Sequence, residues 1–140
     1  MESYKSMEVS VTNSSKKAHN KKGENIVNKI ENPLSFCQQF VKFYFDNIIT
    51  GKDYTMLRNF TIFKYQNVEY TNDSLVNLLS QISKCKSTIS NIEFLPSGSR
   101  RFDIMITGKF DTDTFTQFFM LTNEKKDTWY IKSSIIVLIK

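Results

Sequence analysis

The sequence predicts an α+β domain in which helices come before a run of antiparallel strands. Apolar residues recur at helical spacing between Phe36 and Ile48 and again between Leu75 and Ile82. From Ser87 onward the apolar period shortens from 3.6 residues to two. All twelve Phe lie between Phe36 and Phe119, so the core is expected there. Helices and strands that are segregated along the chain are typical of an α+β fold.

Three N-terminal helices are expected. Asn32-Pro33 is a helix start, because Asn caps exposed amides and Pro is tolerated in the first turn, and Gly51 is the expected stop. Residues 53–59 are expected to form a short second helix. Asn72 or Asp73 is expected to cap a third helix, whose apolar face would carry Leu75, Val76, Leu78, Leu79 and Ile82.

Six strands are expected around these helices. An aromatic strand over 60–65 is joined by a tight turn at Gln66-Asn67 to a short strand over 68–70. A strand from Ser87 ends at Pro96-Ser97-Gly98. Three more strands are expected over 102–110, 115–122 and 129–139.

Composition divides the chain into a tail and one domain. Residues 1–32 contain neither Phe nor Trp and consist largely of Ser, Asn, Lys and Glu, so they are predicted to be a disordered basic and polar tail. Residues 33–140 are predicted to be the folded domain, long enough for a single core.

The charge does not favour direct nucleic-acid binding. The formal net charge is +5, with six Lys and four Glu in the tail and thirteen basic against ten acidic residues in the rest. A nucleic-acid groove would concentrate Lys and Arg on one element with exposed aromatics between them. The one dense cluster, at 16–22, leaves three readings open: a solvated charge run, a localisation signal or a weak RNA-binding arm.

The chain shows no pattern typical of an enzyme, a metal site or a cofactor site. Cys37 and Cys85 are isolated, without CxxC spacing, and are expected to be reduced. The one His, His19, lies in the tail, and the four Gly form no phosphate-binding loop. Candidate interior polar groups are Asp46, Tyr65, Asp103 and Gln117, of which Gln117 is expected to be a buried hydrogen-bonding residue rather than a catalyst. No metal or cofactor is therefore expected.

The expected location is the cytoplasm or nucleus. The first 25 residues lack the apolar run of a secretory leader. The longest apolar stretch, 135–139, is far shorter than a membrane span, so no membrane partner is expected.

The last strands are apolar on both faces. Along 115–121 one face would carry Phe115, Gln117, Phe119 and Leu121, and the other Thr116, Phe118 and Met120. In an antiparallel sheet with one solvent-exposed face, apolar and polar residues alternate along each strand. Since helices can cover one face, the second is expected to meet a partner subunit, unless the helices and tail cover more of the sheet.

Two runs carry a resemblance to a known family. The strand over 115–121 fits the pattern Phe-x-Gln-x-Phe-x-Leu, with Trp129 following after a short turn, and 40–45 reads Phe-Val-Lys-Phe-Tyr-Phe. Over about residues 34–140 the chain resembles the nuclear transport factor 2 family. The resemblance implies a cone-shaped fold with three N-terminal helices packed on a strongly curved antiparallel sheet.

The resemblance implies a transport role. The family's import carrier is a homodimer that binds Ran in its GDP form and the Phe-Gly repeats of nuclear pore proteins. A Ran-binding site is expected at Asp111 and Asp113, which match an Asp-x-Asp pair at the cavity mouth, together with Phe63. The chain departs from the carrier in several places. Lys64 and Ser134 each stand where the carrier has an acidic residue, the loop after Asp113 is shorter, and the aromatic of the first helix that meets Phe-Gly repeats has no counterpart near Pro33.

Two alternatives stay open. One is the small subunit of the mRNA export receptor, which uses the same fold to form a heterodimer with a larger domain. The other, less favoured, is a small-molecule enzyme on the same cone. The resemblance and the strand alternation together imply a cavity lined by Phe63, Phe115, Gln117, Phe119 and Ile136. They also imply a homodimer or heterodimer face made by Thr116, Phe118, Met120, Ile135 and Val137.

Overall fold

The computed structural model describes residues 32–125 and 128–139. The predicted tail, with its basic cluster at 16–22 and His19, lies outside the described residues apart from Asn32.

The first helix forms where the sequence predicts it. Helix α2 (Pro33–Phe43) continues into a π-helical turn, η3 (Tyr44–Ile48). The Asn32 side chain accepts a hydrogen bond from the backbone N–H of Ser35 at 3.1 Å, which satisfies one of the exposed amides at the helix start. Gly51 follows with φ of 82°, a conformation that glycine adopts without steric cost.

The predicted second helix at 53–59 is wrong. The Asp53 carboxylate accepts hydrogen bonds from the backbone N–H and hydroxyl of Thr55, at 2.9 and 2.6 Å, and so stabilises a turn instead of a helix start. Strand β1 (Leu57–Tyr65) begins two residues later. The described residues therefore hold two α-helices, not the three expected.

The remaining helix, α3 (Asn72–Ser83), starts one residue earlier than expected. Thr71 takes the N-cap position, and its backbone N–H donates to Ser74 Oγ at 3.0 Å. The side chains of Leu75, Leu78, Leu79 and Ile82 are buried, as the helical spacing predicts, whereas Val76, expected on the same face, is 43% exposed.

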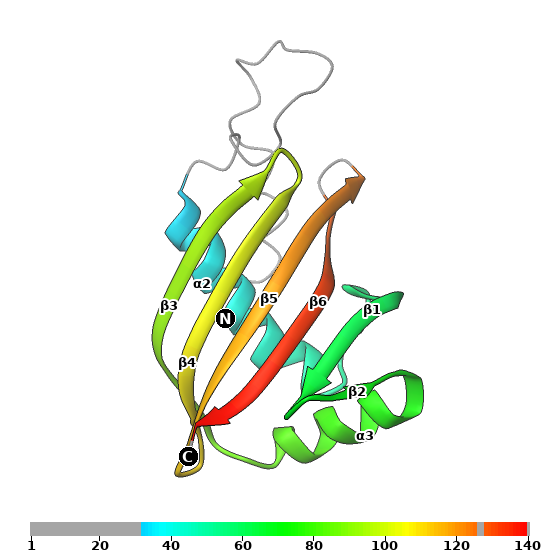
Figure 1. Cartoon of the computed structure of the whole chain (residues 1–140), viewed down its shortest axis with the longest axis vertical. Helices are drawn as coiled ribbons and strands as arrows, with labels where there is room; N and C mark the ends of the chain where they lie inside the picture. The colour runs from blue at the N-terminus through cyan, green and yellow to red at the C-terminus, as the bar shows by residue number, and fades with distance from the viewer. Residues whose placement is uncertain (1–31, 126–127, 140) are drawn as a thin grey trace.

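One six-stranded sheet organises the domain, in the order β2-β1-β6-β5-β4-β3 (Figure 1). The hairpin turn at Gln66-Asn67 has positive φ at both residues, as a two-residue turn requires. The other five strands are β2 (Val68–Tyr70), β3 (Ser87–Gly98), β4 (Arg101–Phe110), β5 (Asp113–Lys125) and β6 (Thr128–Ile139).

The sheet departs from the strongly curved antiparallel sheet that was expected. Strands β1 and β6 pair in parallel, whereas the other neighbours are antiparallel. The central pair, β4 and β5, keeps its register without a bulge from Arg101–Thr122 to Phe110–Asp113. Register shifts occur in the other pairs, β1–β6, β3–β4 and β5–β6, but the central ladder is unbroken, and the sheet is gently twisted and not tightly curled (Figure 1).

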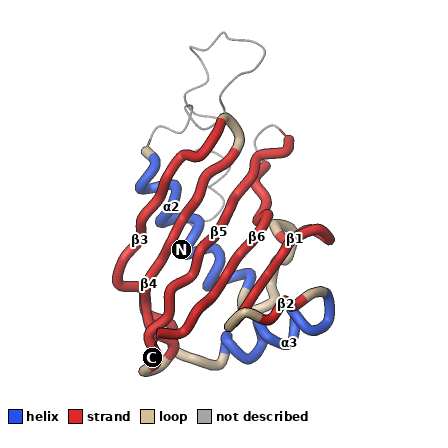
Figure 2. The backbone as a smooth tube through the Cα atoms, in the orientation of Figure 1, coloured by secondary structure: helices blue, strands red, loops and turns tan. Residues whose placement is uncertain are grey.

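The two helices leave one face of the sheet uncovered. Helix α2 lies behind the sheet in the view of Figure 2, and α3 lies at the end where β1 and β2 meet. We call the face that packs on α2 the inner face and the opposite one the outer face. The core between α2 and the inner face is largely aromatic, with Phe36, Phe40, Tyr44, Phe63, Phe102, Phe115 and Phe119 fully buried.

Candidate interaction surface

Strict alternation along β4 and β5 separates the two faces of the sheet. On β4 the side chains of Phe102, Ile104 and Ile106 are fully buried, while the intervening residues are partly or largely exposed. Strand β5 repeats the pattern with every second residue from Phe115 to Asn123 buried. This period of two, sustained on neighbouring strands in register, places each set on one face.

The outer face has an apolar centre. Phe118 on β5 pairs with Met105 on β4 and with Ile135 on β6, so the three side chains stand side by side. Met105 and Ile135 are each 40% exposed and Val137 is 47% exposed. Side chains of this size in one contiguous group mark an interaction site more often than ordinary surface.

All five residues expected at a dimer face lie on this outer face. Thr116, Phe118 and Met120 are half-buried, and Ile135 and Val137 are exposed. In Figure 1 neither described helix lies over the front of β5 and β6, the strands that carry them.

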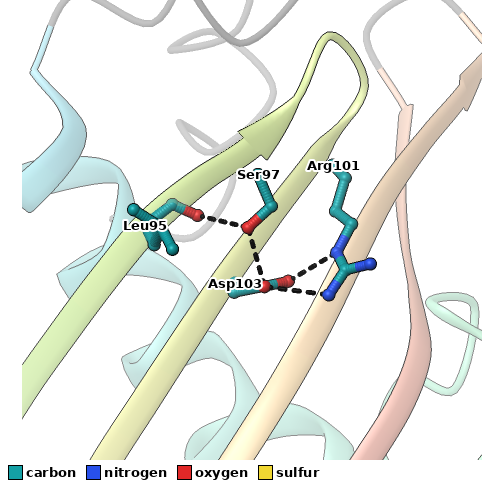
Figure 3. Close-up of polar contacts among 4 residues, drawn as sticks. All are labelled: Leu95, Ser97, Arg101 and Asp103. Atoms are coloured by element: carbon teal, nitrogen blue, oxygen red, sulfur yellow. Dashed lines mark hydrogen bonds and ion pairs between the residues drawn. The ribbon is translucent and has the colours of Figure 1, made fainter.

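A polar cluster lies at one end of the outer face, beside the turn between β3 and β4 (Figure 3). Arg101 and Asp103 form a two-point ion pair, with Nε to Oδ1 at 2.9 Å and Nη2 to Oδ2 at 3.0 Å. The Ser97 hydroxyl lies 2.7 Å from Asp103 Oδ2 and 3.2 Å from the carbonyl oxygen of Leu95. The hydrogen bond to Asp103 raises the pKa of Arg101 above its ordinary value. The cluster is therefore polar but internally neutralised.

The five residues expected to line a cavity lie on the inner face, and all are fully buried: Phe63, Phe115, Gln117, Phe119 and Ile136. Aromatic rings fill the space around them. The Phe119 ring meets Phe40 and Tyr44 edge-on at centroid distances of 4.9 and 4.8 Å, and the Phe115 ring stacks on Phe110 at 3.8 Å.

One polar trio interrupts this aromatic core. Gln117 Nε2 donates to the Tyr44 hydroxyl oxygen at 3.0 Å and to Ser134 Oγ at 2.9 Å. Gln117 Oε1 is buried without a hydrogen-bond partner in the described structure. Burial raises the pKa of Tyr44 above its ordinary value, and the hydrogen bond from Gln117 opposes that shift. Since none of the three groups ionises near neutral pH, the trio can form hydrogen bonds but cannot supply a general base.

The expected Ran-binding residues are divided between surface and core. Asp111 and Asp113 are exposed at the turn between β4 and β5, whereas Phe63 is fully buried. Asp111 has φ of 57°, and its Oδ1 accepts from the backbone N–H of Lys86 at 2.9 Å, so this carboxylate holds the start of β3. Register places Lys64, which pairs with Ile135, on the outer face.

The other interior candidates do not form a site. Asp46 forms a surface ion pair with Lys42 at 3.3 Å. Asp103 belongs to the outer-face cluster. Tyr65 is partly buried near Tyr70 and Asp113, and burial, then these neighbours, raise its pKa.

Sequence reasoning missed several outer-face residues. Met105, Leu95 and Ile62 are 40%, 62% and 43% exposed and contribute apolar surface. The alternation of β4 contained the signal for Met105, because it lies between the buried Ile104 and Ile106. To assign Ile62 and Leu95 to the outer face, the pairing register across the sheet must be known, and the sequence alone does not provide it.

The described residues offer neither a metal-binding cluster nor a membrane-spanning helix. They hold no group of three or more His, Cys, Asp or Glu side chains placed to bind a metal ion. No helix among them is long and apolar enough to cross a membrane.

Comparisons with known proteins identify the fold. No protein-family model matches the chain, and no curated protein matches its sequence. Among solved structures, a chain of the complex of yeast deubiquitinase Ubp3 with its Bre5 cofactor has 21% sequence identity and a TM-score of 0.63. That match covers 78% of this chain and 98% of the other.

Two further structures show the range of this fold. Nuclear transport factor 2 (Ntf2) from Cryptosporidium parvum is 14% identical with a TM-score of 0.57, covering 74% of this chain and 91% of the other. A putative ketosteroid isomerase from Parabacteroides distasonis is 8% identical with a TM-score of 0.63, covering 86% and 94%. At these identities the likeness shows the fold alone. This chain has the nuclear transport factor 2-like fold, which carries transport factors and isomerase-like enzymes alike.

Proposed function

We propose that this chain is a protein-binding adaptor that works as a dimer through its outer face. The observation that carries the proposal is the apolar centre of that face, formed by Met105, Phe118, Met120, Ile135 and Val137. On an antiparallel sheet whose other face packs on helices, these positions would ordinarily be polar.

The chemistry of the interior supports binding over catalysis. The fold hosts both activities, so the function has to be argued from the residues. The trio of Tyr44, Gln117 and Ser134 holds no group that ionises near neutral pH, and aromatic rings pack closely around it. The surface through which the domain would bind a partner is therefore its outer face.

A charge at the centre of the outer face tests the proposal. Phe118→Glu would place an uncompensated carboxylate in the dimer interface, so we expect monomers in sedimentation velocity where the parent forms dimers. Val76→Glu is the matched control, because Val76 is 43% exposed on α3, away from the outer face. If Phe118→Glu sediments like the parent, the face is not the interface.

For the partner we propose a role in nucleocytoplasmic transport, as an import carrier for Ran-GDP that also contacts Phe-Gly repeats of pore proteins. Support comes from the resemblance and from two exposed carboxylates on one rigid turn. Asp113 is the sharper test residue, because the Asp111 carboxylate also binds the backbone of Lys86. Asp113→Asn should weaken Ran-GDP binding by about 1–3 kcal/mol. Glu69→Gln, a change on exposed β2, should leave it unchanged; equal binding by all three proteins would remove the import role.

A second candidate partner is the large subunit of an mRNA export receptor, bound at the outer face as a heterodimer. Three observations favour it: Phe63 is buried, Asp111 is used by the fold, and Lys64 adds a cation. These three features leave fewer acidic and aromatic side chains free to contact Ran. Capture experiments with purified Ran-GDP and with the export receptor's large subunit separate the two roles, and either role implies action in the nucleus and cytoplasm.

A further inference from the structure

The end of β3 presents a serine hydroxyl that other proteins can reach. Residues 93–100 are all exposed, and Ser97 lies within this run. The ladder between β3 and β4 shifts register between Pro96 and Gly98, so Ser97 has no Cα partner on β4. Since β3 is an edge strand of the described sheet, its other edge carries no neighbouring strand. An enzyme that binds extended segments can therefore approach Ser97 from that edge.

Two charged side chains surround this hydroxyl (Figure 3). Ser97 Oγ donates to Asp103 Oδ2 at 2.7 Å, and Arg101 Nη2 donates to the same oxygen at 3.0 Å. The hydroxyl and the guanidinium thus share one carboxylate oxygen as their acceptor. A phosphate group attached to the serine would therefore lie within reach of the guanidinium.

We propose that Ser97 is a phosphorylation site and that its phosphate takes Arg101 away from Asp103. The phosphoryl donor is ATP, bound by a protein kinase. The bond from the γ-phosphorus to ADP breaks, a bond from Ser97 Oγ to that phosphorus forms, and the hydroxyl proton passes to the catalytic aspartate of the kinase. Arg100 and Arg101 follow Ser97 closely, so the kinase is of the class that recognises basic residues beside the phosphoacceptor.

Phosphorylation would change the electrostatics of the cluster. In the unmodified chain one guanidinium pairs with one carboxylate, and the serine hydroxyl donates to that carboxylate. Phosphoserine carries a charge of about −1.5 to −2 and three strong acceptor oxygens, so Ser97 would change from a donor to an acceptor. It would then repel Asp103 and attract Arg101, whose planar guanidinium binds phosphate at two points.

Two neighbours of Ser97 do not take these roles. Ser99 has the same exposure and the same arginines, but it stands apart from the cluster of Ser97, Arg101 and Asp103 (Figure 3). Arg100 Nη1 donates to Asn123 Oδ1 at 2.9 Å and so is held at β5. The geometry thus assigns the phosphate to Ser97 and its partner to Arg101.

The position of the cluster gives the phosphate an effect on the outer face. Asp103 pairs with Leu95 on β3 and with Met120 on β5, which belongs to the apolar centre. A phosphate at Ser97 would place uncompensated negative charge beside side chains that a partner has to cover. Burial of such a charge is costly, so phosphorylation should weaken association. This effect rests on the proposed function, whereas the phosphorylation site itself does not.

Kinase treatment of the full chain tests the site. With ATP and a protein kinase that selects arginine after the phosphoacceptor, we expect a single phosphate, located on Ser97 by tandem mass spectrometry. Ser97→Ala should take up none, and Ser99→Ala, the matched change in the same turn, should be phosphorylated like the parent. A phosphate on Ser99 instead, or a parent chain that stays unmodified, overturns the assignment.

Phosphorus NMR tests the exchange of partners. Phosphoserine introduced at position 97 during translation gives the modified chain without a kinase. A guanidinium beside the phosphate favours its dianion, so Arg101→Gln should raise the second pKa of the phosphate by about half a pH unit or more. Arg100→Gln is the matched control and should raise it less. Equal titration curves for the three proteins would show that the phosphate does not bind Arg101.

Sedimentation equilibrium separates this inference from the proposed function. If the outer face is the interface, phosphoserine at position 97 should raise the dissociation constant of the dimer at least about tenfold. A dimer that the phosphate leaves unaffected overturns the regulatory effect, while the proposed dimer stands. A monomeric parent chain overturns the proposed function and the regulatory effect together, and the kinase and NMR experiments still decide the phosphorylation site.

Discussion

Gln117 shows how one buried residue can tie the helix to two strands. Its amide bonds Tyr44 on η3 and Ser134 on β6, while the residue itself belongs to β5. Within an aromatic core such bonds gain strength from low polarity, and leaving a partner unpaired is correspondingly costly.

Removal of the Tyr44 hydroxyl should therefore destabilise the domain. We expect Tyr44→Phe to lower the free energy of unfolding by about 1–3 kcal/mol, because one amide hydrogen of Gln117 loses its acceptor. In a Gln117→Leu background the same change should cost close to nothing. Urea unfolding of the four proteins forms a double-mutant cycle, and equal costs in both backgrounds would show that the bond does not stabilise the domain.

Cys37 gives the domain a predictable weakness at high pH. Its side chain is fully buried on α2, and burial raises the pKa of the thiol from 9.0 to about 12. Above pH 9 the thiol of the unfolded chain loses its proton while the native thiol keeps it. The stabilisation is thus complete below pH 9 and is lost as the pH rises toward 12.

The loss of stability at high pH can be estimated from the proton that the Cys37 thiol releases on unfolding. The parent should lose about 1.4 kcal/mol of stability per pH unit through Cys37, or about 2 kcal/mol between pH 8 and pH 10.5. Cys37→Ala lacks this contribution, so its stability should fall by that much less over the same range. Parallel pH slopes for the two proteins, measured by urea unfolding, would contradict the prediction.

At the scale of elements, the hairpin of β3 and β4 depends on one close backbone approach. The register of β3 shifts between Ile89 and Asn91, and Ser90 Oγ bonds the carbonyl oxygen of Thr107 there at 3.0 Å. A Cβ added at Gly108, which pairs with Ile89, would overlap the backbone of Thr88 and Ile89. The bulge thus requires glycine on the facing strand.

The two glycines of this hairpin should respond differently to substitution. Gly108→Ala should lower the free energy of unfolding by at least about 2 kcal/mol, because backbone atoms cannot move aside cheaply. Gly98→Ala is the matched control, since its Cβ would meet only Arg101 Cβ at 3.8 Å, an ordinary contact. Thermal unfolding of both variants checks this, and equal losses would mean that the bulge can relax.

Local patterns in the sequence were enough to predict most elements but not their pairing. The alternation of β5 already divides Phe118 from Phe119, and Asn32 with Pro33 marks the helix start. The turn at Asp53 was misjudged because Asp favours helix caps and turns alike, and the bond to Thr55 decides between them.

Residues that meet across distant strands could not be found from the sequence. The parallel pairing of β1 with β6 joins segments about 70 residues apart, and it moves Lys64 to the outer face beside Ile135. The contact of Asp103 with Ser97 likewise depends on the geometry of the β3–β4 turn. Such contacts are set by tertiary structure and leave no local signature.

At the scale of the whole molecule, the proposed dimer would couple stability to association. Exposed Ile135 and Val137, together with half-buried Phe118, would lose water only when a second copy covers them. Covering them stabilises the folded state by the hydrophobic effect and by mass action. A dimer of this kind should unfold at a temperature that depends on protein concentration.

Dilution makes that coupling measurable. A hundredfold dilution removes about 2.7 kcal/mol per dimer, or about 1.4 kcal/mol per protomer, which lowers the melting temperature of a domain of this size by several degrees. Phe118→Glu should melt at one temperature at every concentration, because its monomer has no association to lose. Val76→Glu, with its charge on α3, should keep the parent's dependence. Calorimetry across the same dilution series gives the answer: a parent whose melting temperature does not move with concentration is not held together through this face.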